Sequence, residues 1–192
     1  MQLKNSSFAQ SVGSTRRRPT RRRAISLAVW AGLALASIGC GSDGPLGPGF
    51  GGTGSVTATG AVSASGSGLA LFQSTSSGGA SLFQVLVAPL SQTAATWQLQ
   101  IANYSGRPAV GTYTLSALSP SSPDPTATFY YANGATMDAY NSVSGQLVIT
   151  SSSSSSVRGT FTFTATNASG GTGSVTVHGS FNAECAPGLP CE

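Results

Sequence analysis

Hydrophobic and polar residues alternate with a period of two in several segments after residue 55. TWQLQIA (residues 96–102) alternates apolar residues with glutamine, whereas VRGTFTFTAT (157–166) and SVTVHGSF (174–181) alternate them mainly with threonine and serine. A period of two places successive side chains on opposite sides of a strand. Each segment therefore predicts a β-strand with one buried face and one face in water.

The rest of this region continues as short strands separated by turns. Clusters of Gly, Pro, Asn and Ser are typical of turns, and six consecutive serines at 151–156 predict a hairpin loop. No segment after residue 55 has helical periodicity. We therefore predict an all-β fold, an antiparallel β-sandwich or barrel of about 8–10 short strands. Further strands are expected near residues 56–62, 69–73, 81–87, 111–118, 126–131 and 146–150, with turns at 76–79, 103–108, 119–125, 132–134 and 168–173.

The N-terminal region has the pattern of an export signal. RRRPTRRR (residues 16–23) precedes the uncharged run AISLAVWAGLALASIG (24–39), which is 16 residues long. A membrane-spanning helix needs roughly 20 apolar residues, so residues 1–39 are interpreted as a signal peptide, with an uncleaved anchor as the alternative. TRRRAI (20–25) also resembles a twin-arginine export signal, and the general secretion route stays open beside it.

Cys40 directly follows the apolar run and its small residues, an arrangement that resembles the bacterial lipobox. There the chain is cut before a cysteine that receives lipid; Ser37 stands where that pattern usually has leucine. Acyl chains such as palmitate add about 0.8 kcal/mol of membrane affinity per buried methylene. The predicted organisation is a signal peptide (1–39), the lipidated Cys40 with a Gly/Pro linker (40–55), the β domain (56–182) and a cysteine-containing tail (183–192).

The positive net charge of the whole chain, +4, belongs to the predicted signal peptide. Only Arg107 and Arg158 follow Cys40, whereas all five acidic residues do, so the mature part carries 2 − 5 = −3. Nucleic-acid binding relies on basic residues that neutralise phosphates. The charge distribution therefore excludes nucleic acid as a partner.

Two further cysteines, Cys185 and Cys191, flank a short loop in CAPGLPC. Disulfides persist in the oxidising conditions that an exported protein meets, so we expect this pair to staple the tail. Two thiols and one distant histidine make an incomplete metal site, and we predict neither a metal nor another cofactor.

Catalytic chemistry is not indicated by the remaining polar residues. His178 lies on the threonine side of a predicted strand, and no G-x-S-x-G motif is present. Asp124 lies in a Pro-rich loop, where Asp typically caps a turn, and Asp138 is the other acid well inside the domain. We therefore predict that the protein is not an enzyme, with a hydrolase as the less favoured alternative.

Aromatic residues are the remaining candidates for ligand binding. FYYANGATMDAY (129–140) holds a concentration of them. If Phe129 and Tyr131 point inward, Tyr130 points outward. Such rings would stack on sugars, although aromatic residues in strands also serve simply as core. The candidate stacking residues are Trp97, Tyr104, Tyr130 and Tyr140.

The C-terminal hairpins resemble those of the DUF6252-like bacterial lipoproteins. The similarity covers about residues 95–182 and rests on GQLVIT (145–150), VRGTFTFTATN (157–167) and GSVTVHGSFN (173–182), together with the upstream GTYTL (111–115). The resemblance implies a surface or periplasmic lipoprotein of unknown function, and it supplies no catalytic residues.

Together these observations predict a bacterial cell-envelope protein, anchored through lipid on Cys40 to a membrane facing the periplasm or the cell surface. Its β domain is expected to have a non-catalytic binding or structural role, with an envelope protein or a glycan as partner. The alternative is a carbohydrate- or peptide-binding module that uses exposed aromatic residues.

Overall fold

Nine strands build the part of the chain that the computed structural model describes, residues 51–90, 95–119 and 122–192. The predicted signal peptide, Cys40 and the linker up to residue 50 lie outside the described residues. No helix in the described ranges is long and apolar enough to cross a membrane. The strands are β1 (Gly52–Gly60), β2 (Ala64–Ser77), β3 (Ala80–Ala88), β4 (Ala95–Asn103), β5 (Gly111–Thr114), β6 (Thr126–Asn133), β7 (Thr136–Ser152), β8 (Ser156–Asn167) and β9 (Ser174–Cys185).

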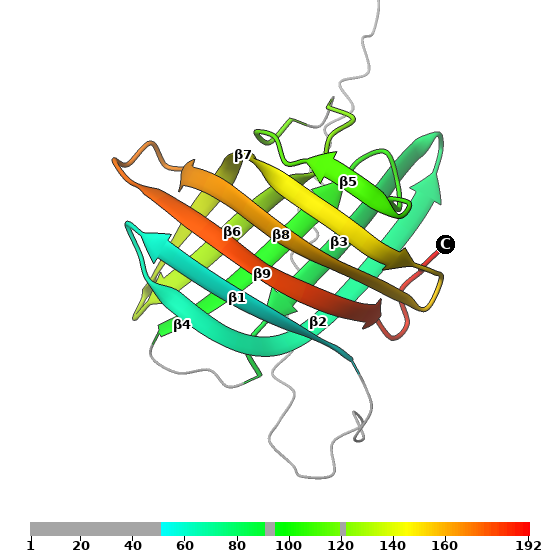
Figure 1. The fold of residues 1–192 in the computed structure, drawn as a ribbon, viewed down its shortest axis with the longest axis horizontal. Helices are drawn as coiled ribbons and strands as arrows, with labels where there is room; N and C mark the ends of the chain where they lie inside the picture. The colour runs from blue at the N-terminus through cyan, green and yellow to red at the C-terminus, as the bar shows by residue number, and fades with distance from the viewer. Residues whose placement is uncertain (1–50, 91–94, 120–121) are drawn as a thin grey trace, which may run out of the picture. The chain divides into compact units, whose positions relative to one another are not determined.

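The strands form a closed antiparallel barrel. Their order is β5-β7-β6-β4-β3-β2-β1-β9-β8, and pairing of β7 with β8 closes the ring of eight strands. Figure 1 shows β1, β9 and β8 crossing the front of the barrel. The predicted all-β antiparallel fold is confirmed, and closure makes it a barrel. A closed barrel leaves no long unpaired edge to which another chain could add a strand.

β7 is long because it changes partner along its length. Its first part pairs with β6 and its last part with the short β5, while β8 pairs with it from Tyr140 to Ser152. The register shifts between Ser142 and Ser144. The buried Ser142 hydroxyl donates to the carbonyl of Ser116 and accepts the Ala127 N–H at 3.0 Å. Ser142 therefore joins β6, β7 and the segment that follows β5, at the point where the ladder changes partner.

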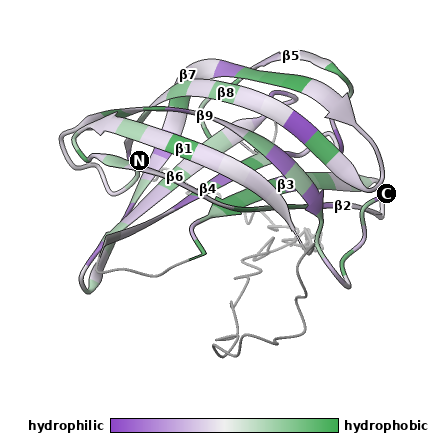
Figure 2. Cartoon of the chain, turned by 60° about the horizontal axis from the view of Figure 1, so that its bottom comes forward, coloured by the Kyte–Doolittle hydropathy of each residue, from purple (hydrophilic) through white to green (hydrophobic). Residues whose placement is uncertain are grey.

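Along each strand, side chains alternate between the barrel interior and the solvent. Eight strands enclose an interior just wide enough for side chains to fill, and the inward positions form one buried cluster. The outward positions of β1, β8 and β9 are mostly threonine and serine, and these strands have pale stretches in Figure 2, the colour of weakly polar residues. The largest fully buried side chains include Phe72, Phe83, Phe129 and Phe163.

Several strands extend beyond their predicted bounds where glycine occupies inward positions. β1 begins at Gly52, inside the predicted linker, and β2 begins at Ala64, before the predicted start at residue 69. A Cβ on Gly52 would lie 1.7 Å from the Asn182 carbonyl oxygen, and one on Gly68 would lie 1.9 Å from that of Ala88. Glycine is required there by close backbone approach, so these strands lack the apolar alternation that reveals the others.

At the C-terminal side, two segments are also longer than their sequence pattern indicates. The strand predicted near 146–150 is part of the 17-residue β7, and β9 continues to Cys185, inside the predicted tail. The hairpin predicted for the serine run is confirmed, with Ser153–Ser155 between β7 and β8. In this turn the Ser153 hydroxyl accepts the Ser156 N–H at 3.0 Å.

Candidate functional site

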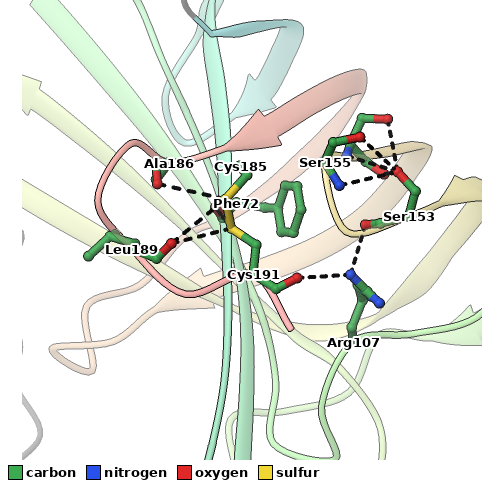
Figure 3. The surroundings of a disulfide bond; sticks show 9 residues. Phe72, Arg107, Ser153, Ser155, Cys185, Ala186, Leu189 and Cys191 are labelled. Atoms are coloured by element: carbon green, nitrogen blue, oxygen red, sulfur yellow. Dashed lines mark hydrogen bonds between the residues drawn. A yellow bond between two sulfur atoms is a disulfide. The ribbon is translucent and has the colours of Figure 1, made fainter.

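The C-terminal tail is fastened to one end of the barrel by a disulfide and by main-chain hydrogen bonds. Cys185 and Cys191 are bonded, with their Cα atoms 6.0 Å apart, which confirms the predicted pair. Ala186 N–H donates to the Phe72 carbonyl at 2.8 Å, and Ser74 N–H donates to the Pro190 carbonyl at 2.9 Å. Figure 3 shows the ring of Phe72 beside the disulfide. We call this the tail end of the barrel.

Arg107 holds the same end from the loop between β4 and β5. Its Nη1 donates to the Ser153 carbonyl at 2.8 Å and to the Cys191 carbonyl at 3.0 Å (Figure 3). One guanidinium therefore ties the serine hairpin to the tail. Hydrogen bonds from a charged donor are stronger than those from a neutral donor. We therefore interpret these contacts as stabilising the tail end of the barrel.

Removing the disulfide is expected to destabilise the barrel by about 2 kcal/mol. The bond closes a short loop, and its loss returns that loop's conformational entropy to the unfolded chain. In a Cys40→Ser background, the Cys185→Ser/Cys191→Ser protein should unfold at lower urea than the oxidised parent. The parent measured with reductant is the control and should match the double variant. Equal urea midpoints for the oxidised and reduced parent would show that the hydrogen bonds alone hold the tail.

The opposite end of the barrel is formed by turns, and we call it the hairpin end. It comprises the β1–β2, β6–β7 and β8–β9 turns. The Ala61 N–H donates to the Ser174 carbonyl at 2.9 Å, and the Ala168 N–H donates to the Ala139 carbonyl at 2.8 Å. These bonds fix the turns to neighbouring strands. The inward residues near them therefore have defined positions.

A row of polar and aromatic side chains crosses the inner wall at the hairpin end. Trp97 on β4 is the direct partner of Tyr131 on β6, which in turn faces Asp138 on β7. Tyr131 packs against the core, and Asp138 lies on the same strand face as the buried Tyr140. Aromatic rings, a carboxylate and hydroxyl groups thus gather where the barrel wall meets solvent.

Trp97 completes this arrangement by lying against a glycine. A Cβ on Gly66 of β2 would come within 3.4 Å of the indole Nε1 and 3.5 Å of Cζ2. The pairing of β2 with β3 stops at Leu69 and Ala88, so the first residues of β2 extend beyond β3. We define the rim site as Gly66, Trp97, Tyr131, Asp138 and Tyr140.

The four aromatic residues proposed for stacking do not form one exposed platform. Trp97 and Tyr140 are buried in the barrel wall, with exposures of 7% and 4%. Tyr104 is exposed in the turn after β4, and Tyr130 lies on the outer face of β6, as the alternation predicts. The set of stacking residues predicted from the sequence did not include Tyr131 or Asp138. Their signal was the ANG turn, which makes the flanking strands a hairpin and brings these positions opposite each other.

Tyr130 should make the protein less stable at alkaline pH. Burial raises the pKa of its phenol above the ordinary 10.0, and the nearby Tyr104 adds to the shift. The folded protein therefore holds this proton more tightly than the unfolded chain does, so stability is intact below about pH 10 and decreases as the pH rises above it. Between about pH 9 and about pH 11, the urea midpoint should fall further in the parent than in Tyr130→Phe. An equal fall in both proteins would contradict the assignment.

The candidate catalytic groups are not brought together. His178 is exposed on the outer face between Thr57 and Thr162, whereas Asp138 lies on the inner face of the barrel wall. Asp124 is exposed in the loop before β6, at the other end of that strand from Asp138. Among the described residues, no three His, Cys, Asp or Glu side chains are grouped to hold a metal ion.

Comparison with known proteins identifies the family. No curated protein and no solved structure shows significant similarity to this chain. Residues 88–183, half of the chain, match the family described as Domain of unknown function (DUF6252). The matched segment runs from the end of β3 through most of β9 and includes the GQLVIT and GTFTFTA strands on which the resemblance rested. The chain therefore belongs to the DUF6252 family.

Proposed function

We propose that this protein is a lipid-anchored component of the bacterial cell envelope whose barrel has a non-catalytic binding role. The observation that carries the anchoring is Cys40, which follows a basic and then an apolar segment and precedes the first strand by only 12 residues. A lipid on this cysteine would hold the barrel close to the membrane surface.

Two features of the barrel support an exported location. The Cys185–Cys191 disulfide suits an oxidising compartment. Only two arginines occur among the described residues, and the outer faces of β1, β8 and β9 depend on hydroxyl groups for their solubility.

A binding role is favoured over a purely structural one because the two ends of the barrel differ. At the tail end, Arg107 and the tail main chain are engaged in hydrogen bonds. At the hairpin end, aromatic and polar groups of the rim site gather beside solvent. Mouths of β-barrels are common places for small-molecule sites.

The anchoring is tested by the intact mass of the protein recovered from the membrane fraction of its native host. We expect a chain that begins at Cys40 and carries acyl groups, and we expect Cys40→Ser to abolish the lipid mass. Ser37→Leu is the matched control, because it restores the usual lipobox residue and should leave lipidation intact. An unlipidated mass in the parent would overturn the anchoring.

A further inference from the structure

We propose that the rim site binds a small neutral ligand bearing hydroxyl groups, for which a sugar ring is the fitting chemical class. This inference rests on the binding role proposed above and specifies its site and ligand. It extends the family assignment, which carries no ligand.

Two nearly buried side chains of the rim site keep a polar group that has no hydrogen-bond partner within the described part of the chain. Among the described residues, neither the Trp97 indole N–H nor the Tyr140 hydroxyl makes a hydrogen bond, although both side chains are more than nine-tenths buried. No fully buried side-chain nitrogen or oxygen in these ranges lacks a partner. Both groups therefore keep some exposure to solvent, and the Trp97 indole lies at the hairpin end, where a ligand can meet it.

The charges near the rim site exclude an anion as the preferred ligand. The two arginines of the described residues are placed elsewhere: Arg107 binds the tail, and Arg158 on β8 donates to Asn182 at 2.9 Å. The ionisable acid at the rim is Asp138, whose carboxylate would repel a phosphate or carboxylate group.

The hydrogen-bonding groups also disfavour a cation. An indole N–H only donates, so it needs an acceptor on the ligand, and an ammonium group has none. Asp138 is exposed, where an ion pair contributes little. A ligand hydroxyl group meets both requirements, because it can accept a hydrogen bond from the Trp97 indole and donate one to the Asp138 carboxylate. The ring of Tyr131 offers an apolar surface for the carbon skeleton of a sugar.

The packing beneath the rim limits the size of the ligand. Leu99 and Phe129, direct partners on β4 and β6, are fully buried two residues further into the barrel. They fill the interior, so the ligand rests on the rim and does not enter the barrel. We therefore expect a small ligand that is held at the surface of the rim, and weak binding of single monosaccharides.

Trp97 provides a direct readout of binding. The chain has two tryptophans, and Trp30 lies in the predicted signal peptide, so the mature protein carries Trp97 alone. Glucose and N-acetylglucosamine, as neutral probes, should shift its fluorescence saturably in the purified mature protein that begins at Cys40. Glucuronate and glucosamine, as charged analogues, should bind more weakly.

The variants are chosen from adjacent positions on one strand. Tyr131→Ala should weaken binding about fivefold to tenfold, because it removes the ring against which the carbon skeleton of the sugar packs. Tyr130→Ala is the matched control, since Tyr130 lies on the outer face of β6, and it should bind like the parent. Gly66→Val should block the site by covering the indole edge. Thermal melts confirm that each variant is folded.

Three outcomes would overturn the inference. The first is the absence of a saturable change with either neutral sugar, in fluorescence and in NMR chemical shifts. The second is equal weakening by Tyr130→Ala and Tyr131→Ala, and the third is tighter binding of glucosamine than of glucose. None of these results alters the mass of the lipidated protein, so failure of the ligand class is distinguishable from failure of the anchoring.

Discussion

Gly179→Ala is expected to lower the free energy of unfolding by about 3 kcal/mol or more. Gly179 lies on β9 opposite Val56 of β1 and Phe161 of β8. A Cβ at this position would lie 2.0 Å from the carbonyl oxygen of Ser55 and 2.7 Å from Cζ of Phe161. The nearest atom belongs to the backbone, so the β1–β9 ladder itself would have to move.

The destabilisation expected for Gly179→Ala comes from the lack of space for a Cβ atom and not from the backbone conformation of Gly179. Gly179 does not have a positive φ, so alanine adds no torsional strain there. Gly171→Ala is the matched control: Gly171 also lacks a positive φ, and a Cβ there would meet only Asn167, at 3.5 Å or more. Urea unfolding should show a change within about 0.5 kcal/mol for Gly171→Ala.

A second variant separates the two contacts of Gly179. Phe161→Leu shortens the ring side chain but leaves the Ser55 carbonyl in place, so it should not restore stability to Gly179→Ala. Recovery in this double variant would mean that the ring, and not the Ser55 backbone, sets the requirement for glycine. A Gly179→Ala protein as stable as the parent would contradict the close approach of β1 and β9.

Phe161→Ala is expected to cost about 3–5 kcal/mol, the range for deleting a buried phenylalanine. Phe161 is 2% exposed, and its ring centroid lies 6.1 Å from that of Phe163 and 6.4 Å from that of Phe181. The truncation removes apolar contacts and leaves a cavity that the rigid barrel wall cannot close. The measurement is the urea midpoint at constant slope.

Thr162→Ala is the control for this prediction, because Thr162 is the next residue of β8 and lies on the exposed outer face. It should change stability by less than about 1 kcal/mol. Comparable losses of stability from Phe161→Ala and Thr162→Ala would contradict the placement of Phe161 on the inward face and Thr162 on the outward face of β8.

The strands that alternate cleanly were predictable because burial of one face is a local requirement. In the middle of β4, β8 and β9 the inward positions are apolar or glycine and the outward positions are polar or small, so the sequence displays the two faces directly. Inward-facing glycines hid the start of β2. Gly66 leaves room for the Trp97 ring, and Gly68 leaves room for the Ala88 carbonyl, neither of which is near in sequence.

The candidate site was only partly predictable. The alternation in FYYANGATMDAY correctly separated Phe129 and Tyr131 from Tyr130. It could not say which inward residues lie at mid-barrel and which at the rim. That distinction depends on how far neighbouring strands extend, and it is why Phe129 belongs to the core and Tyr131 to the rim site.

By itself, the sequence determined the all-β class, the family, the pairing of Cys185 with Cys191 and the chemistry of each strand face. These follow from local pattern and from residues close together in the chain. Only the tertiary structure decided that the sheet closes into a barrel and that Trp97, Tyr131 and Asp138 meet at one end. Closure depends on the register between β7 and β8 and on the partner change along β7, which long-range packing sets and no single segment encodes.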